Sequence, residues 1–263
     1  MSKTYKGLTT NGVTELTLQE EGVGNIGTQT IVWDGATNGV IDQVQGDIPD
    51  SWKLIGNTLK QLQIGTSCTS IGSSAFSYCS GLTGSLTIPD SVESIGNDAF
   101  YMGFGGDSWS GSLTIGNSVT SIGSGAFYRC GGFTGSLTIG NSVTSIGSGA
   151  FLYCTGLTGS LVIPDSVTSI GSSAFYFCGF TGSLVIPDSV TSIGSNAFGN
   201  CSSITALYTN TPAASWVGTN ALENTTALVN IYEGPDVIGQ YSATFQGGSG
   251  MTVSAWTNYP NIP

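Results

Sequence analysis

The sequence predicts a mainly β fold, a solenoid built from short stacked segments, on two observations. The fifteen residues TGSLVIPDSVTSIGS stand at 158–172 and again, unchanged, at 181–195. Within each copy, Leu-x-Ile places apolar residues at every second position, which is typical of a strand with one buried face. A segment this short cannot bury its apolar face alone, but a stack of copies can, because each copy covers the next.

Copies of a longer phrase fill most of the chain. The shared pattern is L-x-I-[PG]-[DN]-S-V-x-S-I-G-x-x-A-F-x-x-C, and the copies lie 23–27 residues apart. Their first residues are Leu62, Leu86, Leu113, Leu137, Leu161, Leu184 and Leu207. Repetition at a period of this length indicates a solenoid of about seven repeats, each of which contacts only its neighbours.

Each part of the repeat has a local structural meaning. Pro-Asp-Ser or Gly-Asn-Ser turns the chain after the first strand, and Val-x-Ser-Ile forms a second short alternating piece. The glycine that follows permits a tight turn or a close approach of two backbones. Ala-Phe-x-x-Cys places a phenyl ring and a small sulfur inward from a turn. If adjacent copies pair, each repeat advances the rod by roughly 4.8 Å.

The two ends of the chain depart from the repeat. Residues 1–45 carry the hairpin signal Asn-Gly, so we expect a small N-terminal β segment, which we interpret as an attachment module. Terminal repeats are expected to be atypical because one of their faces meets solvent. We therefore divide the chain into the N-terminal segment 1–45, a degenerate cap repeat 46–61, the solenoid 62–230 and a C-terminal cap 231–263.

The phrase IPDSVTSIGSSAF, followed by a cysteine, resembles the bacterial surface-antigen type of leucine-rich repeat called BspA-like, over about residues 46–246. The resemblance implies a right-handed leucine-rich-repeat β-solenoid that ends in a strand and a short helix. Here Ile231 and Tyr232 would form the last strand, and Pro235 to about Phe245 the capping helix. Exported family members carry a signal peptide. The N-terminus MSKTYKGLTTNGVTELTL lacks the apolar stretch of one, so we expect either no export by that route or a signal peptide that has been removed.

Charge and residue inventory exclude several functional classes. The net charge is −11 with only five lysines and arginines, so we expect no nucleic-acid partner. No apolar run is long enough for membrane insertion. The chain has no histidine and no phosphate-binding loop, so we expect no enzyme, no catalytic residue and no cofactor. A glycosidase with paired carboxylates remains as a remote alternative, because parallel β-solenoids can host one.

The cysteines are best explained as structural residues. Five of the six share one repeat position, namely Cys79, Cys130, Cys154, Cys178 and Cys201. We interpret them as a buried row of small residues. Side chains of one row point the same way, which disfavours a disulfide ladder, and the chain offers no C-x₂-C spacing for a metal.

Aspartates at the first turn alternate between copies with asparagines. Asp90, Asp165 and Asp188 stand where other copies have Asn117 and Asn141, an exchange that fits turn chemistry. A calcium site between the last two aspartates is the alternative, because carbonyl oxygens lie nearby.

The candidate binding surface is aromatic. One of the two residues after each Ala-Phe should face outward, which would align tyrosines along the rod. The second full copy is three residues longer and carries a phenylalanine and a tryptophan on a glycine-rich bulge. The predicted binding residues are Tyr101, Phe104, Trp109, Tyr128, Tyr153 and Tyr176. Rings of this kind suit contact with a protein or a glycan, although they would equally pack over neighbouring turns.

The sequence therefore predicts a non-catalytic, surface-displayed repeat protein. We expect a virion component, at a phage tail or capsid surface, that recognises a protein or glycan on a host or particle and docks through residues 1–45. The alternative is a secreted or cell-surface bacterial adhesin.

Overall fold

A computed structural model of the chain describes the stacked repeats and parts of both ends. The described residues are 2–9, 12–20, 29–33, 40–41, 59–64, 69–80, 82, 84–105, 111–211, 220–228, 230–233, 235, 240 and 252–255. Side chains are described from Ile64 to Gln240 within these ranges. The described part contains strands, bridges and turns but no helix, so no helix there could cross a membrane.

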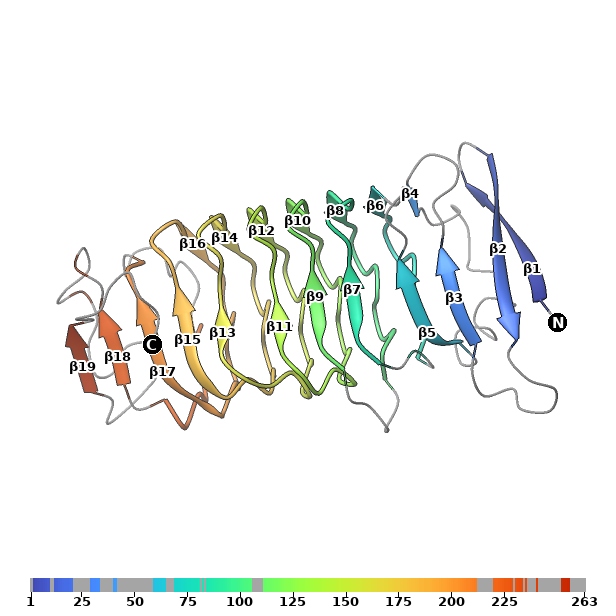
Figure 1. The fold of residues 1–263 in the computed structure, drawn as a ribbon. Coiled ribbons are helices and arrows are strands. Elements are labelled where there is room, and N and C mark those ends of the chain that lie inside the picture. The colour runs from blue at the N-terminus through green and yellow to red at the C-terminus, as the bar shows by residue number, and fades with distance from the viewer. Residues whose placement is uncertain are drawn as a thin grey trace.

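The Leu-x-Ile segments form one side of a rod (Figure 1). The strands on this side are β5 (Leu59–Ile64), β7 (Leu86–Ile88), β9 (Leu113–Ile115), β11 (Leu137–Thr138), β13 (Leu161–Val162), β15 (Gly182–Ile186), β17 (Ile204–Thr209), β18 (Asn230–Glu233) and β19 (Thr252–Ala255). They pair in parallel in three groups along this side: β5 with β3 (Gln29–Trp33), then β7, β9 and β11, then β13, β15, β17, β18 and β19. Within the groups equivalent residues lie side by side, Leu113 between Leu86 and Leu137, and Leu184 between Leu161 and Leu207. The predicted repeat register is confirmed.

The Ser-Ile segments form a second parallel sheet along the rod. Its strands are β4 (Val40–Ile41), β6 (Ser70–Ile71), β8 (Ser94–Ile95), β10 (Ser121–Ile122), β12 (Ser145–Ile146), β14 (Ser169–Ile170) and β16 (Ser192–Ile193). Serine pairs with serine and isoleucine with isoleucine along the predicted repeats, for example Ser121 with Ser145 and Ile122 with Ile146. Each isoleucine is buried and each serine is partly exposed, which is the period-two pattern of a half-buried strand.

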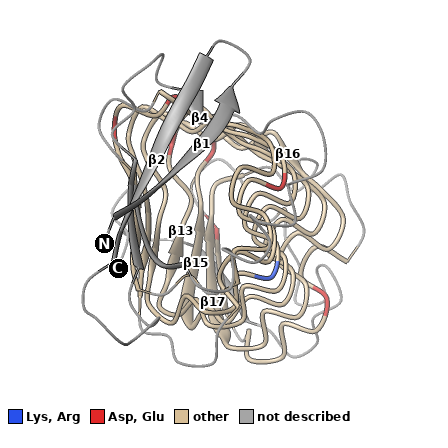
Figure 2. Cartoon of the chain, turned by 90° about the vertical axis from the view of Figure 1, so that its right-hand side faces the viewer, with Lys and Arg blue, Asp and Glu red and all other residues tan. Residues whose placement is uncertain are grey.

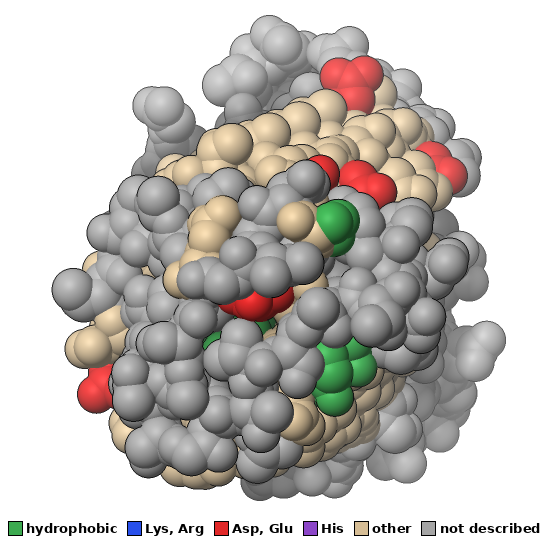
Figure 3. Space-filling model, turned by 90° about the vertical axis from the view of Figure 1, so that its left-hand side faces the viewer, with side chains coloured by type: hydrophobic (Ala, Val, Ile, Leu, Met, Phe, Trp, Pro, Cys, Tyr) green, Lys and Arg blue, Asp and Glu red, His purple; other side chains and the backbone are tan. Residues whose placement is uncertain are grey.

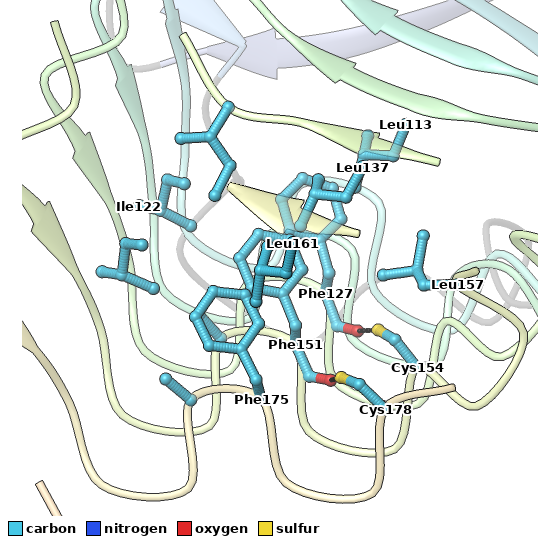
Figure 4. Close-up of a cluster of buried hydrophobic side chains, with 14 of the residues drawn as sticks. Leu113, Ile122, Phe127, Leu137, Phe151, Cys154, Leu157, Leu161, Phe175 and Cys178 are labelled. Carbon is cyan, nitrogen blue, oxygen red and sulfur yellow. Dashed lines mark hydrogen bonds between the residues drawn. The ribbon is translucent and has the colours of Figure 1, made fainter. Parts of the chain in front are cut away.

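The core between the two sheets consists of rows of like side chains (Figure 4). The phenylalanines of the Ala-Phe pairs stack into one ladder: the Phe127 and Phe151 ring centroids are 5.3 Å apart and their planes differ by 4°. The ladder runs through Phe76, Phe100, Phe127, Phe151, Phe175 and Phe198. Offset stacking of this kind adds to the hydrophobic gain from burying each ring.

Turns around the Ala-Phe pairs close the third side of the rod, and their backbone amides are satisfied alternately. Phe127 and Arg129 donate their N–H groups to the next rung, to the carbonyl oxygens of Ala150 at 2.7 Å and Leu152 at 2.8 Å. Between them, Tyr128 donates to Gly125 of its own rung at 2.9 Å. The same alternation recurs along the rod, so the turns satisfy buried backbone groups as a sheet would.

The glycine after each Ser-Ile pair allows adjacent rungs to touch backbone to backbone. A Cβ added at Gly147 would lie 2.5 Å from the backbone nitrogen of Ser124 in the preceding rung. Equivalent glycines meet the same obstacle, which explains why the repeat requires glycine here and confirms the predicted close approach.

The N-terminal segment differs in part from the expectation. β1 (Ser2–Thr9) and β2 (Gly12–Glu20) form an antiparallel hairpin, with Thr9 opposite Gly12. However, β3 (Gln29–Trp33) pairs in parallel with β5, and β4 pairs in parallel with β6, so residues 29–41 supply strands to both sheets of the solenoid. This rung was not recognised in the sequence because residues 29–58 lack the Ala-Phe-x-x-Cys signature. Most of the predicted cap repeat 46–61 lies outside the described residues.

The C-terminal end also extends further than predicted. Ile231 and Tyr232 form a strand, β18, but β19 pairs with it in parallel and continues the sheet. Of the range expected to form the capping helix, only Pro235 and Gln240 are described, and the expectation otherwise lies outside the described residues.

Candidate functional site

The two residues that follow the Ala-Phe pair lie at the surface of the turns in most rungs. In the four rungs from Tyr101-Met102 to Tyr176-Phe177 both side chains are half-buried or exposed, whereas Ser77 and Gly199 in the flanking rungs are buried. Six of these side chains are aromatic and together form what we call the outer row: Tyr78, Tyr101, Tyr128, Tyr153, Tyr176 and Phe177. The expectation was that one residue per rung would face out, whereas in those four rungs both do.

The rings of the outer row touch one another from rung to rung. Tyr101 and Tyr128 stack with centroids 4.6 Å apart and planes 7° from parallel. Tyr153 stacks on Phe177 at 5.3 Å and meets Tyr128 edge to face at 6.1 Å. The row is therefore continuous over five successive rungs. Neighbouring rings and partial burial raise the pKa of Tyr101, with burial as the larger cause.

Several members of the row have an unfavourable backbone conformation. The second residue after each Ala-Phe has a positive φ, 61° at Tyr78, 63° at Tyr153 and 56° at Phe177. Tyr78 is 52% exposed and Phe177 38% exposed. At the same place, Asn200 and Asn224 have φ values of 57° and 56°, which asparagine tolerates better than a bulky residue does.

Among the residues whose side chains are described, Arg129 is the only lysine or arginine, and it lies beside the row. It is the last basic residue in the sequence, since no lysine or arginine follows it and the preceding one is Lys60. Its guanidinium carbon lies 5.5 Å from the ring centroid of Tyr128 and 5.3 Å from that of Tyr153. Figure 2 shows one basic segment among the residues described there, with acidic segments at several places around the outline.

The structure brings together four of the six predicted binding residues, Tyr101, Tyr128, Tyr153 and Tyr176. Phe104 is a correction: it is only 1% exposed and its ring lies 4.6 Å from that of Phe133, in the core. It occupies the apolar position that closes each repeat: compared with the next copy, the chain is two residues shorter before this position and five residues longer after it, a net gain of three. Trp109 lies outside the described residues.

The predicted set omitted three members of the surface, Tyr78, Phe177 and Arg129. All three occupy the second position after Ala-Phe, and they were omitted because only one of the two positions per rung was expected to face outward. The stacked pair Tyr208 and Tyr232, with centroids 4.5 Å apart on β17 and β18, was also missed. The sequence signal for this pair is a tyrosine at the middle position of Leu-x-Ile, where other copies have threonine or valine.

The cysteine row is structural, as predicted. Four thiols donate to the carbonyl oxygen of the phenylalanine in the preceding rung, for instance Cys154 to Phe127 and Cys178 to Phe151, both at 3.1 Å (Figure 4). All five cysteines of the row are free thiols. Burial raises the pKa of Cys79, Cys130 and Cys201 to about 12, so these thiols are poor nucleophiles near neutral pH. Cys68 lies outside the described residues.

Turn aspartates and asparagines accept backbone hydrogen bonds from the next rung. The Asp90 carboxylate accepts the Asn117 N–H at 2.6 Å, and the Asn117 side-chain oxygen accepts the Asn141 N–H at 3.2 Å. This is the predicted turn chemistry. Within the described part, no group of three or more acidic or cysteine side chains is arranged to hold a metal ion.

Comparison with known proteins agrees with the repeat pattern. The sequence pattern described as the BspA type leucine rich repeat region matches residues 54–134 and 120–251, in six copies. No curated protein sequence gives a significant match.

Solved structures with the same kind of fold come from several bacteria. The leucine-rich repeat protein of T. pallidum is 20% identical, with a TM-score of 0.53 over 86% of this chain and 87% of that one. A leucine-rich repeat protein from Bacteroides ovatus is 19% identical, with a TM-score of 0.43 over 90% and 74%. A leucine rich cell surface protein from Faecalibacterium prausnitzii is 19% identical, with a TM-score of 0.29 over 97% and 96%. On the sequence match, which covers well over half of its length, the chain belongs to the family of BspA-type leucine-rich repeat proteins.

Proposed function

We propose that this protein is a non-catalytic recognition rod that is displayed on a surface and contacts a protein partner through the outer row. Leucine-rich repeat proteins of this family are typically non-catalytic and generally mediate protein binding. The absence of histidine from the whole chain and the raised pKa values of the buried thiols agree with that role.

One observation carries the proposal: bulky rings stand where the fold favours asparagine. A non-glycine residue in the left-handed region costs roughly 1–2 kcal/mol. Tyr153 and Phe177 adopt this conformation although it is unfavourable for bulky residues, whereas Asn200 adopts it in the same turn with a smaller conformational free-energy cost. The left-handed conformation belongs to the turn itself, since Ser74, Asp98 and Ser173 adopt it at a second turn position. The presence of exposed rings where asparagine would cost less supports a role in binding.

The packing of the rings favours a protein over a glycan. Sugars bind to tyrosine through the open face of the ring, but the faces within this row are largely occupied by other rings, as between Tyr101 and Tyr128. A partner therefore meets ring edges and neighbouring polar groups, which are the contacts that tyrosines make at protein interfaces.

Surface display has two candidate locations, a virion surface and a bacterial cell surface. The rod shape fits either one, and the virion, with the N-terminal segment as its docking element, is the location that we propose first. Immunogold labelling of purified phage particles and of cells from the source culture separates them. Label confined to the cell envelope would contradict the virion proposal.

Recognition is tested with a variant that keeps the turns and removes the rings. The triple variant Tyr78→Asn, Tyr153→Asn and Phe177→Asn uses the residue that the chain itself places in this conformation. Val162→Thr is the matched control, because Val162 is 41% exposed on the sheet side and the preceding copy has threonine there. Dodecapeptides are selected from a random phage-displayed library on the wild-type protein, and a glycan array is probed in parallel.

We expect the selected peptides to bind the triple variant at least about tenfold more weakly than the wild type, since interface aromatics typically contribute more than 1 kcal/mol each. The Val162→Thr control should bind as the wild type does. Equal binding to the triple variant would refute the role of the row. Ring-dependent binding on the glycan array alone would replace the protein partner by a glycan.

A further inference from the structure

We propose that the partner bound by the outer row presents a carboxylate to Arg129, so that the preferred ligand is an acidic peptide segment. This inference rests on the proposed function and specifies the chemistry of the ligand at the same surface. It follows from the charge of the chain, from the environment of the guanidinium and from the residues that other copies use at this position.

The charge distribution makes Arg129 exceptional. The chain carries sixteen acidic and five basic residues, and Arg129 is the only base after Lys60. The C-terminal end of the rod shows acidic and no basic side chains among its described residues (Figure 3). A single cation in this setting selects strongly among ligands, because like-charged surroundings repel an anion everywhere except at that point.

The guanidinium of Arg129 is held by rings rather than by an acid. Its guanidinium carbon lies beside both Tyr128 and Tyr153, 5.5 and 5.3 Å from the ring centroids, and within the described part of the chain it forms no ion pair. Arg129 is exposed, while its backbone N–H is fixed on the carbonyl oxygen of Leu152 at 2.8 Å. The two rings are perpendicular to each other and lie on one side of the guanidinium, which leaves N–H groups able to bind a carboxylate with two parallel hydrogen bonds.

The fold itself gives no reason for arginine at this place. Arg129 has a φ of 56°, and the equivalent residues Asn200 and Asn224 satisfy the same conformation. The equivalent side chains on either side along the rod, Met102 and Tyr153, are uncharged. Arginine therefore interrupts a neutral row near its middle, which places the anionic group of a ligand between flanking apolar contacts.

The test compares Arg129→Asn, Arg129→Lys and the triple variant with the wild type. The probes are the dodecapeptides selected on the wild-type protein, together with forms in which each Asp or Glu is changed to Asn or Gln. Asparagine keeps the turn, and lysine keeps the charge but loses the two-pronged geometry. Dissociation constants are measured at low and at physiological salt.

We expect the selected peptides to share an acidic residue at one aligned position. Its neutralisation should weaken binding to the wild type about tenfold to a hundredfold, and binding to Arg129→Asn by less than about threefold. Arg129→Lys should retain part of the affinity, and higher salt should weaken the wild type more than Arg129→Asn.

Two results overturn the inference and leave the proposed function standing. One is a set of ring-dependent peptides without an aligned acidic residue. The other is an acidic residue whose neutralisation weakens binding to the wild type and to Arg129→Asn equally. Acidic glycans that require Arg129, in the absence of such peptides, would also overturn the peptide ligand. If the triple variant binds the selected peptides as tightly as the wild type does, in contrast, the proposed function itself is refuted.

Discussion

Two aromatic rows run side by side along this molecule, and they differ in composition and in the regularity of their stacking. The inner row is phenylalanine at six successive rungs, with neighbouring planes within 3–13° of parallel. The outer row lies one or two residues further along the chain at each rung. It consists of five tyrosines and one phenylalanine, with Met102, Arg129 and Leu152 beside them at the same turn positions, and its interplanar angles range from 7° to 88°.

This difference in composition shows which positions the packing of the fold fixes and at which positions it tolerates several residue types. Inside, each ring fills the same space between the same neighbours, and the seventh copy places another buried apolar residue, Leu222, at this position. Outside, the two turn positions hold methionine, arginine, leucine and asparagine as well as rings, as Met102, Arg129, Leu152 and Asn200 show. Side-chain choice in the outer row is therefore less constrained by packing than in the core, and we attribute it to recognition.

The largest test of this contrast removes one ring from each row. Phe151→Ala should lower the free energy of unfolding by about 3–5 kcal/mol, because it opens a cavity in a stacked core. Tyr153→Asn, two residues away, should change it by less than about 1 kcal/mol, since relief of the left-handed conformation offsets the lost stacking. Urea denaturation followed by circular dichroism measures both. Similar losses at the two positions would mean that the outer row is also part of the folding core.

A second test compares two glycines of one turn. Gly147→Ala should cost about 1–3 kcal/mol, because the added methyl group meets the backbone of Ser124 in the preceding rung. Gly149 has a φ of 61°, and its equivalents are Asn196 and Asn220, so Gly149→Asn should be nearly neutral. Thermal unfolding of the two variants measures the difference. A stable Gly147→Ala protein would contradict the close contact between rungs.

A third test concerns the buried thiols, whose effect on stability appears only at high pH. Burial raises the pKa of Cys201 from 9.0 to about 12. Below about pH 9 the thiol is protonated in both states, whereas at higher pH the unfolded chain loses this proton and the folded chain keeps it. Stability should therefore fall between pH 9 and 12, by at most about 1.4 kcal/mol per pH unit for this group.

Cys201→Ala provides the control for this pH dependence, because tyrosines also titrate in the same range. The variant should show a shallower decline than the wild type, measured by urea denaturation at each pH. It should also be less stable near pH 7 by about 1 kcal/mol, since the hydrogen bond to the carbonyl oxygen of Phe175 is lost. Parallel curves for the two proteins would argue against a buried, protonated thiol.

Sequence reasoning recovered most of the solenoid because identical rungs must meet identical neighbours. The spacing of Leu113 and Leu137 set the strand register, and the conserved phrase identified the buried ring and thiol of each turn. The rung at 29–41 was missed because backbone pairing, which defines it, places little demand on side chains. The burial of Phe104 was missed because the adjacent insertion obscured where the repeat ends.

The outer row was predicted only in part for a different reason. Periodicity shows which positions recur, but it does not show how two neighbouring positions share a surface. Arg129 was not among the predicted binding residues because the prediction followed ring content, and its role is suggested only by the two rings that lie beside its guanidinium.

The exact pairing of one rung with the next also has a genetic consequence. A whole period such as 144–167 can be duplicated or deleted by unequal recombination between the matching stretches of the gene, and the new neighbours would still meet in register. Lineages of this protein can thus change the reach of the rod, and the number of surface side chains it offers, in a single step without redesigning the interior.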